Sequence, residues 1–283
     1  MNAVVTAGRP PMNFWSAMAK AFLHGFLICL GIVVLYPLLW MALSGLKNNA
    51  QIFDNPFALP LTWTWSNYVL AWNQGVRDYV TISFIVTVAS GLCTVLVSAW
   101  TAYGLTRTRM PGKPLVVGLV LGGLMLSPTV AVIPLVKMMQ ALGLYNTFWA
   151  LIVLYTAFRI PFSTFLIRAY MLDLSRDVDE AATIDGATES QIFWKITMPL
   201  CRPIIVSCMI LHVLFAWNEY LFAMIFSGGD QTLPVGLTSI MAKHGTNYAV
   251  VFAAMTISAL PIVMVFFAAQ RYFIRGLSEG IGK

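Results

Sequence analysis

Residues 180–199, EAATIDGATESQIFWKITMP, form a charged segment between two apolar stretches that are each long enough to cross a bilayer. Six of the eleven acidic residues of the whole chain fall within residues 173–189. A simple connector between two membrane helices does not need this concentration of charge. We therefore expect the segment to lie outside the membrane and to form a docking surface for another protein.

The spacing within this segment predicts two short helices joined by a bend. Asp177 followed by Glu180, and Thr188 followed by Gln191, both have the form of a capping box. Gly186 lies between the two and is expected to end the first helix in the left-handed conformation. For the second helix, an amphipathic helix lying flat on the membrane is the alternative.

The composition of the rest of the chain indicates a multi-pass membrane protein. Of the 283 residues, 59% are apolar and only 10% are charged. We predict an all-α fold with six transmembrane helices, because six apolar runs have about the 20 residues that a crossing needs. The predicted spans are Ala21–Leu43, Val80–Tyr103, Leu115–Val136, Phe148–Ile167, Ile204–Phe226 and Val250–Phe273. Within them, helix interruptions are expected at Pro128, Pro134, Pro161 and Pro261.

The distribution of Lys and Arg predicts the orientation. Twelve lie in one set of connections and termini and only four in the opposite set, and positive residues favour the cytoplasmic side. Both termini are therefore expected inside, with residues 1–20 as a cytoplasmic segment and 21–283 as the membrane domain. The loop 171–203 is then cytoplasmic, and the loops 44–79 and 227–249 are outside.

Several classes of function are disfavoured by what the chain lacks. The net charge of +6 comes without a basic patch interleaved with aromatics, so no nucleic-acid partner is expected. The four cysteines have no metal-ligand spacing, and no metal or other cofactor is expected on this chain. There is no G-x-x-x-x-G-K-[ST] phosphate loop, so energy from ATP must come from a partner. His, Asp and Glu within the predicted spans are too few for an active site, and we expect no enzymatic activity.

The charged segment also carries a specific sequence pattern. It reads Glu180-Ala181-Ala182, three residues, Gly186, nine residues, Ile196, one residue and then Met198-Pro199. This pattern resembles the EAA loop of ATP-binding-cassette (ABC) importer permeases, with methionine in place of the usual leucine. Three further runs resemble the maltose-type carbohydrate permeases: AWNEYL at 216–221, TLPVGL at 232–237 and QRYFIRGL at 270–277.

The resemblance implies a type I ABC importer permease that moves a carbohydrate inward across the bacterial cytoplasmic (inner) membrane. It implies contact with membrane lipid and three kinds of protein partner: a second permease, two ATPase subunits that bind ATP and Mg, and an extracytoplasmic sugar-binding protein. It also implies that the bend docks on an ATPase subunit. The candidate docking residues are Glu180, Ala181, Ala182, Asp185, Gly186, Ala187 and Thr188.

Two further sites are expected toward the outer side. Asn218 and Glu219 are polar residues within the predicted fifth span, so they are candidates for the substrate pathway or the outer gate. A hydrogen-bonding pair that only fixes the helix bundle is the alternative. The loop before the last span is implied by the resemblance to reach into the binding protein, although a solvated turn would have the same composition. Its residues are Lys243, His244, Gly245, Thr246 and Asn247.

Other transporter classes remain open from the residues alone. A secondary, ion- or proton-coupled transporter is expected to show an inverted repeat, and no second copy of the charged segment is visible. His212 is the one histidine well inside the predicted spans, which leaves few groups for a proton relay. An ABC permease for a non-sugar solute is the third possibility, and the sequence does not identify the sugar.

Overall fold

The computed structural model describes residues 14–243 and 245–281, and every regular element in these residues is a helix. Four helical stretches are long and apolar enough to cross a bilayer: Met18–Gly45, Ser66–Arg107, Phe148–Asp173 and Tyr248–Ala268. A fifth is present if two helices bent by 73° are counted as one span. These findings confirm the all-α, multi-pass prediction.

The long helices extend beyond the predicted spans. Their bounds are Phe14–Gly45 for α1, Arg77–Arg107 for α4, Phe148–Asp173 for α7 and Tyr248–Ile281 for α14. A short helix, α3 (Ser66–Ala71), and a π-helical turn, Trp72–Val76, lead directly into α4. The second half of the outer loop predicted at 44–79 is therefore helical.

The third predicted span, Leu115–Val136, is broken, which confirms the helix interruption expected at Pro128. Two helices replace it, α5 (Lys113–Met125) and α6 (Val132–Ala141). The link between them contains Pro128, which disfavours helical geometry in the residue before it. The other predicted proline in this region, Pro134, lies within α6 without ending it. If α5 and α6 together are counted as one broken crossing, the structure is consistent with six crossings.

The fifth predicted span also differs from the expectation. It begins with α11 (Arg202–Asn218), which meets the preceding short helices at the 73° bend and ends eight residues before Phe226. A separate helix, α12 (Leu221–Phe226), follows. The break falls between Asn218 and Leu221, next to the two polar residues singled out in the sequence.

Two further prolines that were expected to interrupt helices, like Pro134, do not do so. Pro161 lies inside α7, and Pro261 lies inside α14. Pro161 is accommodated by close packing, because a Cβ added to Gly123 of α5 would lie 2.7 Å from its ring. Proline lacks the backbone N–H and so removes one hydrogen bond from α7. The helix stays continuous nevertheless, because a neighbouring helix packs against the proline.

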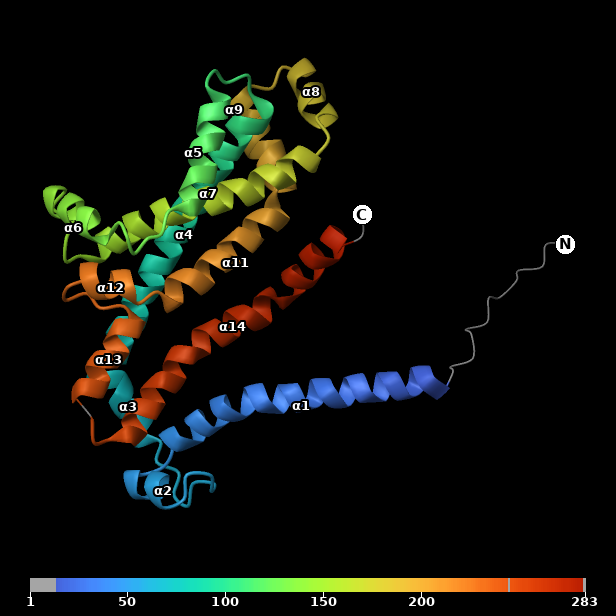
Figure 1. Ribbon diagram of the computed structural model, residues 1–283. Coiled ribbons are helices and arrows are strands. Elements are labelled where there is room, and N and C mark those ends of the chain that lie inside the picture. Colours follow the sequence, from blue (N-terminus) through green and yellow to red (C-terminus); the bar gives the residue numbers. More distant parts are fainter. Residues whose placement is uncertain (1–13, 244, 282–283) are drawn as a thin grey trace.

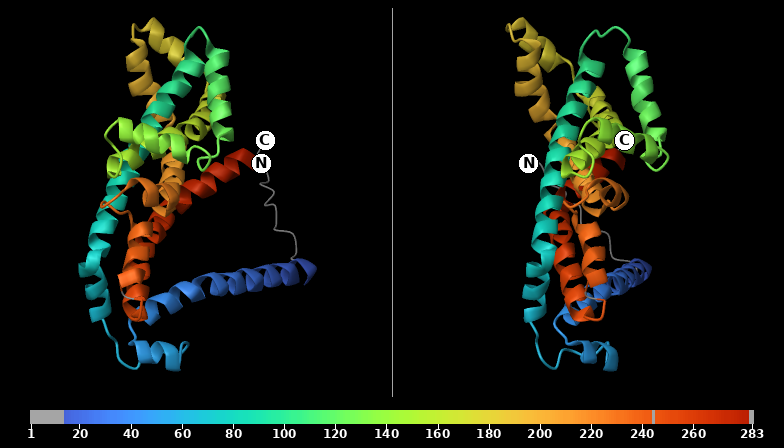
Figure 2. Two further views of the ribbon diagram at one scale, coloured as in Figure 1. Left: turned by 60° about the vertical axis from the view of Figure 1, so that its left-hand side comes forward. Right: turned by 90° about the vertical axis from the view of Figure 1, so that its left-hand side faces the viewer.

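Helix α4 runs along the length of the molecule, and α7 and α11 pack against it (Figures 1 and 2). The face of α4 in this packing carries small hydroxyl residues at helical spacing. All are almost fully buried: Ser83, Thr87, Ser90, Thr94 and Ser98. Small residues allow helix backbones to approach closely, which is how membrane helices pack without a hydrophobic driving force.

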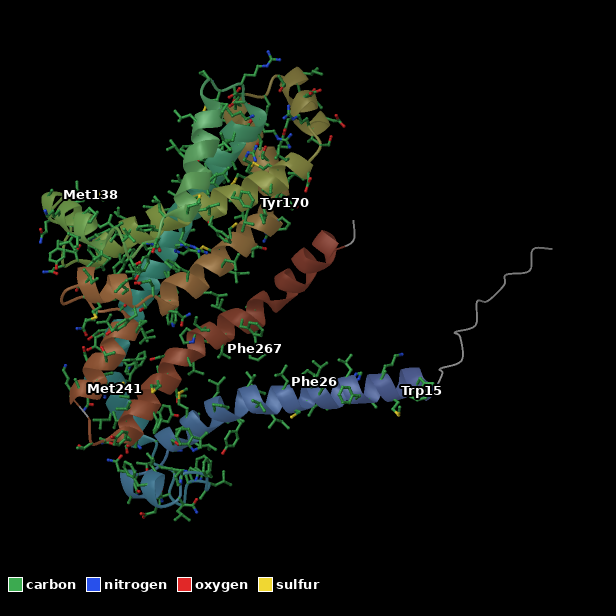
Figure 3. All side chains as sticks on the ribbon, viewed as in Figure 1. Trp15, Phe26, Met138, Tyr170, Met241 and Phe267 are labelled. Atoms are coloured by element: carbon green, nitrogen blue, oxygen red, sulfur yellow. The ribbon has the colours of Figure 1, made fainter. Side chains whose placement is uncertain are left out.

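Helix α1 diverges from the rest of the molecule, and its C-terminal end contacts α14 (Figure 1). Tyr68 donates a hydrogen bond to the carbonyl of Ala42 at 2.8 Å, and the Trp40 ring lies 5.1 Å from the Phe252 ring. Elsewhere its apolar side chains are exposed, as Phe26 shows in Figure 3. This exposure suits a helix that contacts lipid or another apolar surface.

The first outer loop contains a buried lysine. Lys47 is 1% exposed, and its ammonium donates a hydrogen bond to the carbonyl of Pro56 at 2.8 Å. Burial lowers the pKa of Lys47. The lysine thus closes the first half of this loop on itself, and α2 (Asn49–Asp54) contacts α14.

Candidate functional site

The charged segment forms a helical hairpin at one end of the molecule, beside the C-terminal end of α4 (Figure 1). Its first helix is α8 (Asp177–Ile184), and its second begins with α9 (Glu189–Ile192). A π-helical turn, Phe193–Thr197, and α10 (Met198–Leu200) continue the second helix to the bend before α11. The predicted helix, glycine bend and helix are confirmed.

The bend is a complete Schellman motif centred on Gly186. The residue has φ of +82°, a left-handed conformation that glycine adopts without steric cost. Its amide donates to the carbonyl of Thr183 at 3.1 Å, and the amide of Ala187 donates to the carbonyl of Ala182 at 3.0 Å. These are the two backbone bonds that define the motif. The orientation of the second helix is therefore fixed by backbone geometry at one residue.

One of the two predicted capping boxes is present. The amide of Thr188 donates to Gln191 Oε1 at 2.9 Å, and the amide of Gln191 donates to Thr188 Oγ1 at 3.4 Å. The box predicted from Asp177 and Glu180 is wrong, because Asp177 is already the first residue of α8. Its amide instead donates to Ser175 Oγ at 3.2 Å.

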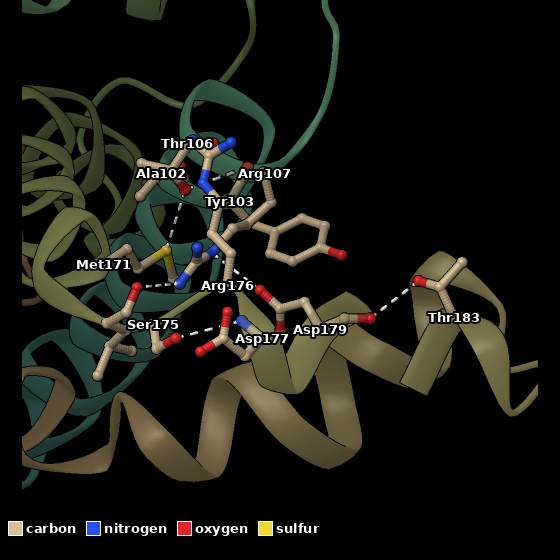
Figure 4. A network of polar contacts seen from close by, with 11 residues as sticks. Ala102, Tyr103, Thr106, Arg107, Met171, Ser175, Arg176, Asp177, Asp179 and Thr183 are labelled. Carbon is tan, nitrogen blue, oxygen red and sulfur yellow. Dashed lines mark hydrogen bonds and ion pairs between the residues drawn. The ribbon is translucent and has the colours of Figure 1, made fainter. Parts of the chain in front are cut away.

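Two arginines hold α8 against the end of α4 (Figure 4). Arg107 Nε lies 3.0 Å from Asp179 Oδ2, and Arg107 also donates to the carbonyl of Leu174 at 3.1 Å. In the opposite direction, Arg176 donates to the carbonyl of Thr106 at 3.0 Å. The side chains of Arg107 and Asp179 are only 7% and 18% exposed, so solvent screens this pair poorly. We call these contacts the arginine latch.

The second helix of the hairpin is anchored by aromatic contacts. Phe193 is 2% exposed, and its ring lies 5.2 Å from Tyr103 and 6.2 Å from Trp100 of α4. Trp194 remains half exposed and packs edge-on against Phe193 at 4.9 Å. Because Phe193 is buried within the chain, it is not available to a membrane surface, as a flat amphipathic helix would require.

The tip of the hairpin is exposed and carries an apolar side chain that the sequence did not single out. Ile184, the last residue of α8, is 86% exposed beside Asp185 and Gly186. The sequence did contain a local signal for a docking side chain, namely an apolar isoleucine at a charged bend. The same isoleucine also fitted the body of the predicted helix. Of the seven candidate docking residues, only Ala182 and Ala187 are half-buried; the others are exposed.

Glu219 makes only contacts within the bundle in the described residues. Tyr155 of α7 donates to Glu219 Oε2 at 2.7 Å, and the amides of Phe222 and Ala223 donate to the same carboxylate at 2.9 and 3.1 Å. Glu219 thus satisfies the first amides of α12 and fixes the break after α11. Asn218, in contrast, is exposed and bonds only to its own helix, through the carbonyl of Leu214.

Changing Glu219 to Gln is expected to lower thermal stability in detergent. The amide group lacks one acceptor oxygen, so at least one of the three donors loses its partner, at a cost of about 1–3 kcal/mol. Asn218→Ala is the control, because its one bond is local and its melting midpoint should stay unchanged. A slower substrate uptake by Glu219→Gln with an unchanged melting midpoint would contradict this and favour a pathway role.

The loop before α14 is tied to the first outer loop. It follows α13 (Leu233–Lys243), and Asn49 donates to the carbonyl of Thr246 and accepts from the amide of Ala249. Lys243, Gly245 and Thr246 are exposed. Of the five residues predicted to contact a binding protein, His244 lies outside the described residues.

His212 is fully buried, and its Nε2 atom lies 2.8 Å from Ser90 Oγ. Among the described residues, no hydrogen bond joins it to Glu219, which binds Tyr155 instead. The described residues also contain no cluster of three or more His, Cys, Asp or Glu that would hold a metal ion.

Long apolar helices, broken helices beside them and a structured, exposed hairpin at one end define the class as a multi-pass helical membrane protein. Residues 114–279 match the family described as binding-protein-dependent transport system inner membrane component. The match covers more than half of the chain, and the chain belongs to this family of transport permeases.

Individual relatives agree over nearly the full length. The probable ABC transporter permease protein YurM of Bacillus subtilis is 45% identical over 257 residues, covering 90% of this chain and 86% of the relative. The diacetylchitobiose uptake system permease protein NgcG of Streptomyces coelicolor is 33% identical, covering 92% and 88%. A chain of a bacterial ABC transporter involved in alginate import has the same fold, with a TM-score of 0.81 at 22% identity, covering 94% of this chain and all of that one.

Proposed function

We propose that this chain is one of two permease subunits of an ATP-driven, binding-protein-dependent importer of carbohydrates. The observation that carries the proposal is the exposed hairpin tip on a rigid support, within a chain of the permease family. The sugar assignment is supported by the functions for which relatives are named, among them a diacetylchitobiose uptake permease. A second permease completes the pathway, because this chain leaves α1 largely uncovered.

The hairpin tip, from Glu180 to Thr188, docks into a cleft on an ATPase subunit. Ile184 fills an apolar part of that cleft, and Glu180 and Asp185 pair with basic residues at its rim. ATP and Mg are bound by the two ATPase subunits, and this chain binds no cofactor of its own. Movement of the docked tip reaches α4 through the arginine latch, so nucleotide-driven closure shifts the membrane helices.

In the orientation that we propose, the hairpin and both termini lie in the cytoplasm. Basic residues at the hairpin end support it, since Arg107, Arg109, Lys113, Arg176 and Lys195 all lie there. The opposite end, with Lys243 to Asn247, then faces the extracytoplasmic binding protein. Asn218, exposed at the end of α11, lies on the substrate pathway, and the Glu219 carboxylate shapes the break beside it.

The test is uptake by the assembled transporter in proteoliposomes, with the partner permease, the ATPase subunits and the binding protein encoded beside this chain. Neutral di- to tetrasaccharides are offered as a panel, with ATP inside or absent and with or without an ionophore. We expect uptake of at least one sugar that needs ATP and ignores the ionophore. Uptake that needs an ion gradient and no ATP would indicate a secondary transporter. ATP-driven uptake of other solutes only would refute the sugar assignment.

A further inference from the structure

A polar cavity of about 680 Å³ lies at the end of the molecule opposite the hairpin, where the π-helical turn meets the start of α4. Its volume falls in the range of about 300–1,000 Å³ that is typical of small-ligand sites. The side chains that line it include Asn73, Gln74, Asp78, Tyr79, Asp230 and Gln231. None of these residues takes part in the sites described above.

The backbone at this cavity has a special geometry that positions one aromatic ring. Gly75 has φ of +124°, and Gln74 is also non-helical within the π-helical turn. A Cβ on Gly75 would lie 3.2 Å from the Tyr79 ring, and a Cβ on Gly236 of α13 would overlap that ring. Two glycines therefore confine the Tyr79 ring from two sides, and larger residues at either position would displace it.

Two amide side chains that line the cavity, Gln74 and Gln231, differ in their hydrogen bonding. Gln74 Oε1 is buried and accepts no hydrogen bond from any described residue. Gln231 Oε1 accepts from Ser239 Oγ at 2.8 Å, which holds that side chain in place. A buried acceptor without a partner is costly unless a ligand or water supplies a donor. Gln74 lines the cavity, so a small rotation of its side chain would bring this oxygen to a hydroxyl donor of a bound molecule.

The mixture of charges favours a neutral ligand. Asp78 and Asp230 would repel an anion, and Lys243, which also lines the cavity, offsets one of these two charges. The cavity offers carboxylate acceptors and amide groups that both donate and accept, together with one aromatic ring. This set matches a molecule that carries several hydroxyl groups and apolar C–H faces.

From this geometry we infer that the cavity is a subsite for a neutral oligosaccharide at the outer mouth of the permease. The inference rests on the proposed function, because it assigns this end to the outside and the substrate to the carbohydrates. The subsite would hold the leading sugar units by hydrogen bonds to Gln74 and Asp78 and by contact with Tyr79 before they enter the membrane.

The direct test is protection of a reporter cysteine, measured on the purified transporter without its binding protein. Cys29 and Cys93, which are exposed, are replaced by serine, and Asn73→Cys supplies a thiol on the cavity wall. Millimolar maltotriose, cellotriose and chitotriose are added, and the rate of labelling by a maleimide is measured. The sugar that the transporter imports is expected to slow labelling by about 3- to 10-fold, the effect of one or two hydrogen bonds.

Two variants make the test specific. Asp78→Asn is expected to raise the sugar concentration for half-protection by about 3- to 10-fold. Asp54→Asn, an exposed acidic residue on α2 away from the cavity, should leave that concentration unchanged, and a thiol at Asp54→Cys should label equally fast with and without sugar. Gln231→Cys gives a second reporter if Asn73→Cys disturbs the π-helical turn.

The outcomes separate this inference from the proposed function. Imported sugar that protects neither reporter would overturn the subsite and leave the importer assignment intact. In a separate measurement the sugar-free binding protein is added; if it slows labelling and the sugar does not, the cavity is a protein contact and the subsite is overturned as well. If the transporter imports no neutral sugar at all, the proposed sugar function fails, and the subsite fails with it.

Discussion

Gly186→Pro is expected to lower sugar uptake by about 5- to 150-fold, the range for loss of a coupling free energy of about 1–3 kcal/mol. Proline requires φ near −65°, whereas this position has φ of +82°. Proline also lacks the amide that donates to Thr183 in the Schellman motif. The second helix of the hairpin would leave its present direction, and the tip would no longer fit the cleft proposed on the ATPase.

The matched control for this variant is Gly186→Asn. No atom lies within 4 Å of a Cβ built at Gly186, so a side chain has room there. Asparagine adopts the left-handed conformation more readily than most other residues. Uptake by Gly186→Asn should therefore stay close to that of the unmodified protein. Equal uptake by the two variants would show that the bend is not needed for coupling.

The step that fails is identified by measuring ATP hydrolysis beside uptake. Gly186→Pro should insert into the membrane normally, because the bend lies outside the apolar spans. The stimulation of ATP hydrolysis by the sugar-loaded binding protein is expected to disappear. Glu180→Lys, which reverses an exposed charge on α8 without changing the bend, should reduce uptake through the docking surface alone.

Features set by neighbouring residues could be predicted from the sequence. The glycine bend at Gly186 and the capping box at Thr188 depend on residues within a few positions, and both are present. The all-α membrane class follows from apolar runs and needs no tertiary information. The exception among local signals is Asp177, because α8 has Arg176 as its N-cap, one residue earlier than the acidic pattern indicated.

Features that depend on distant residues could not be predicted. Tyr155 and Glu219 are 64 positions apart, and only the packing of α7 beside α11 makes their hydrogen bond possible. The burial of Lys47 depends on a hydrogen bond to the carbonyl of Pro56, nine positions away in the chain. Gly123 decides how Pro161 is accommodated, yet the two residues lie on different helices. These outcomes follow from tertiary packing, which overrides local preference.

The arginine latch belongs to the same group, and its proposed role can be measured by a double-mutant cycle. Arg107→Gln and Asp179→Asn each remove one charge of a pair whose atoms lie 3.0 Å apart. Each single change leaves a mostly buried charged group without its partner, so each should reduce coupled uptake. The double variant removes both charges and should lose less than the sum of the two, with an interaction free energy of about 0.5–3 kcal/mol.

The control for the cycle is Asp173→Asn combined with Arg107→Gln. Asp173 ends α7 near the hairpin but is exposed, so its removal should add to that of Arg107 without interaction. Hydrogen exchange of the α8 amides is measured in parallel, because a loosened latch should raise exchange in α8 and leave the centre of α4 protected. Simple additivity of Arg107→Gln and Asp179→Asn, with unchanged exchange in α8, would mean that this pair does not transmit movement from the hairpin to the membrane helices. The route would then have to run through Phe193 and its contacts with Trp100 and Tyr103, which join the second helix of the hairpin to the same face of α4.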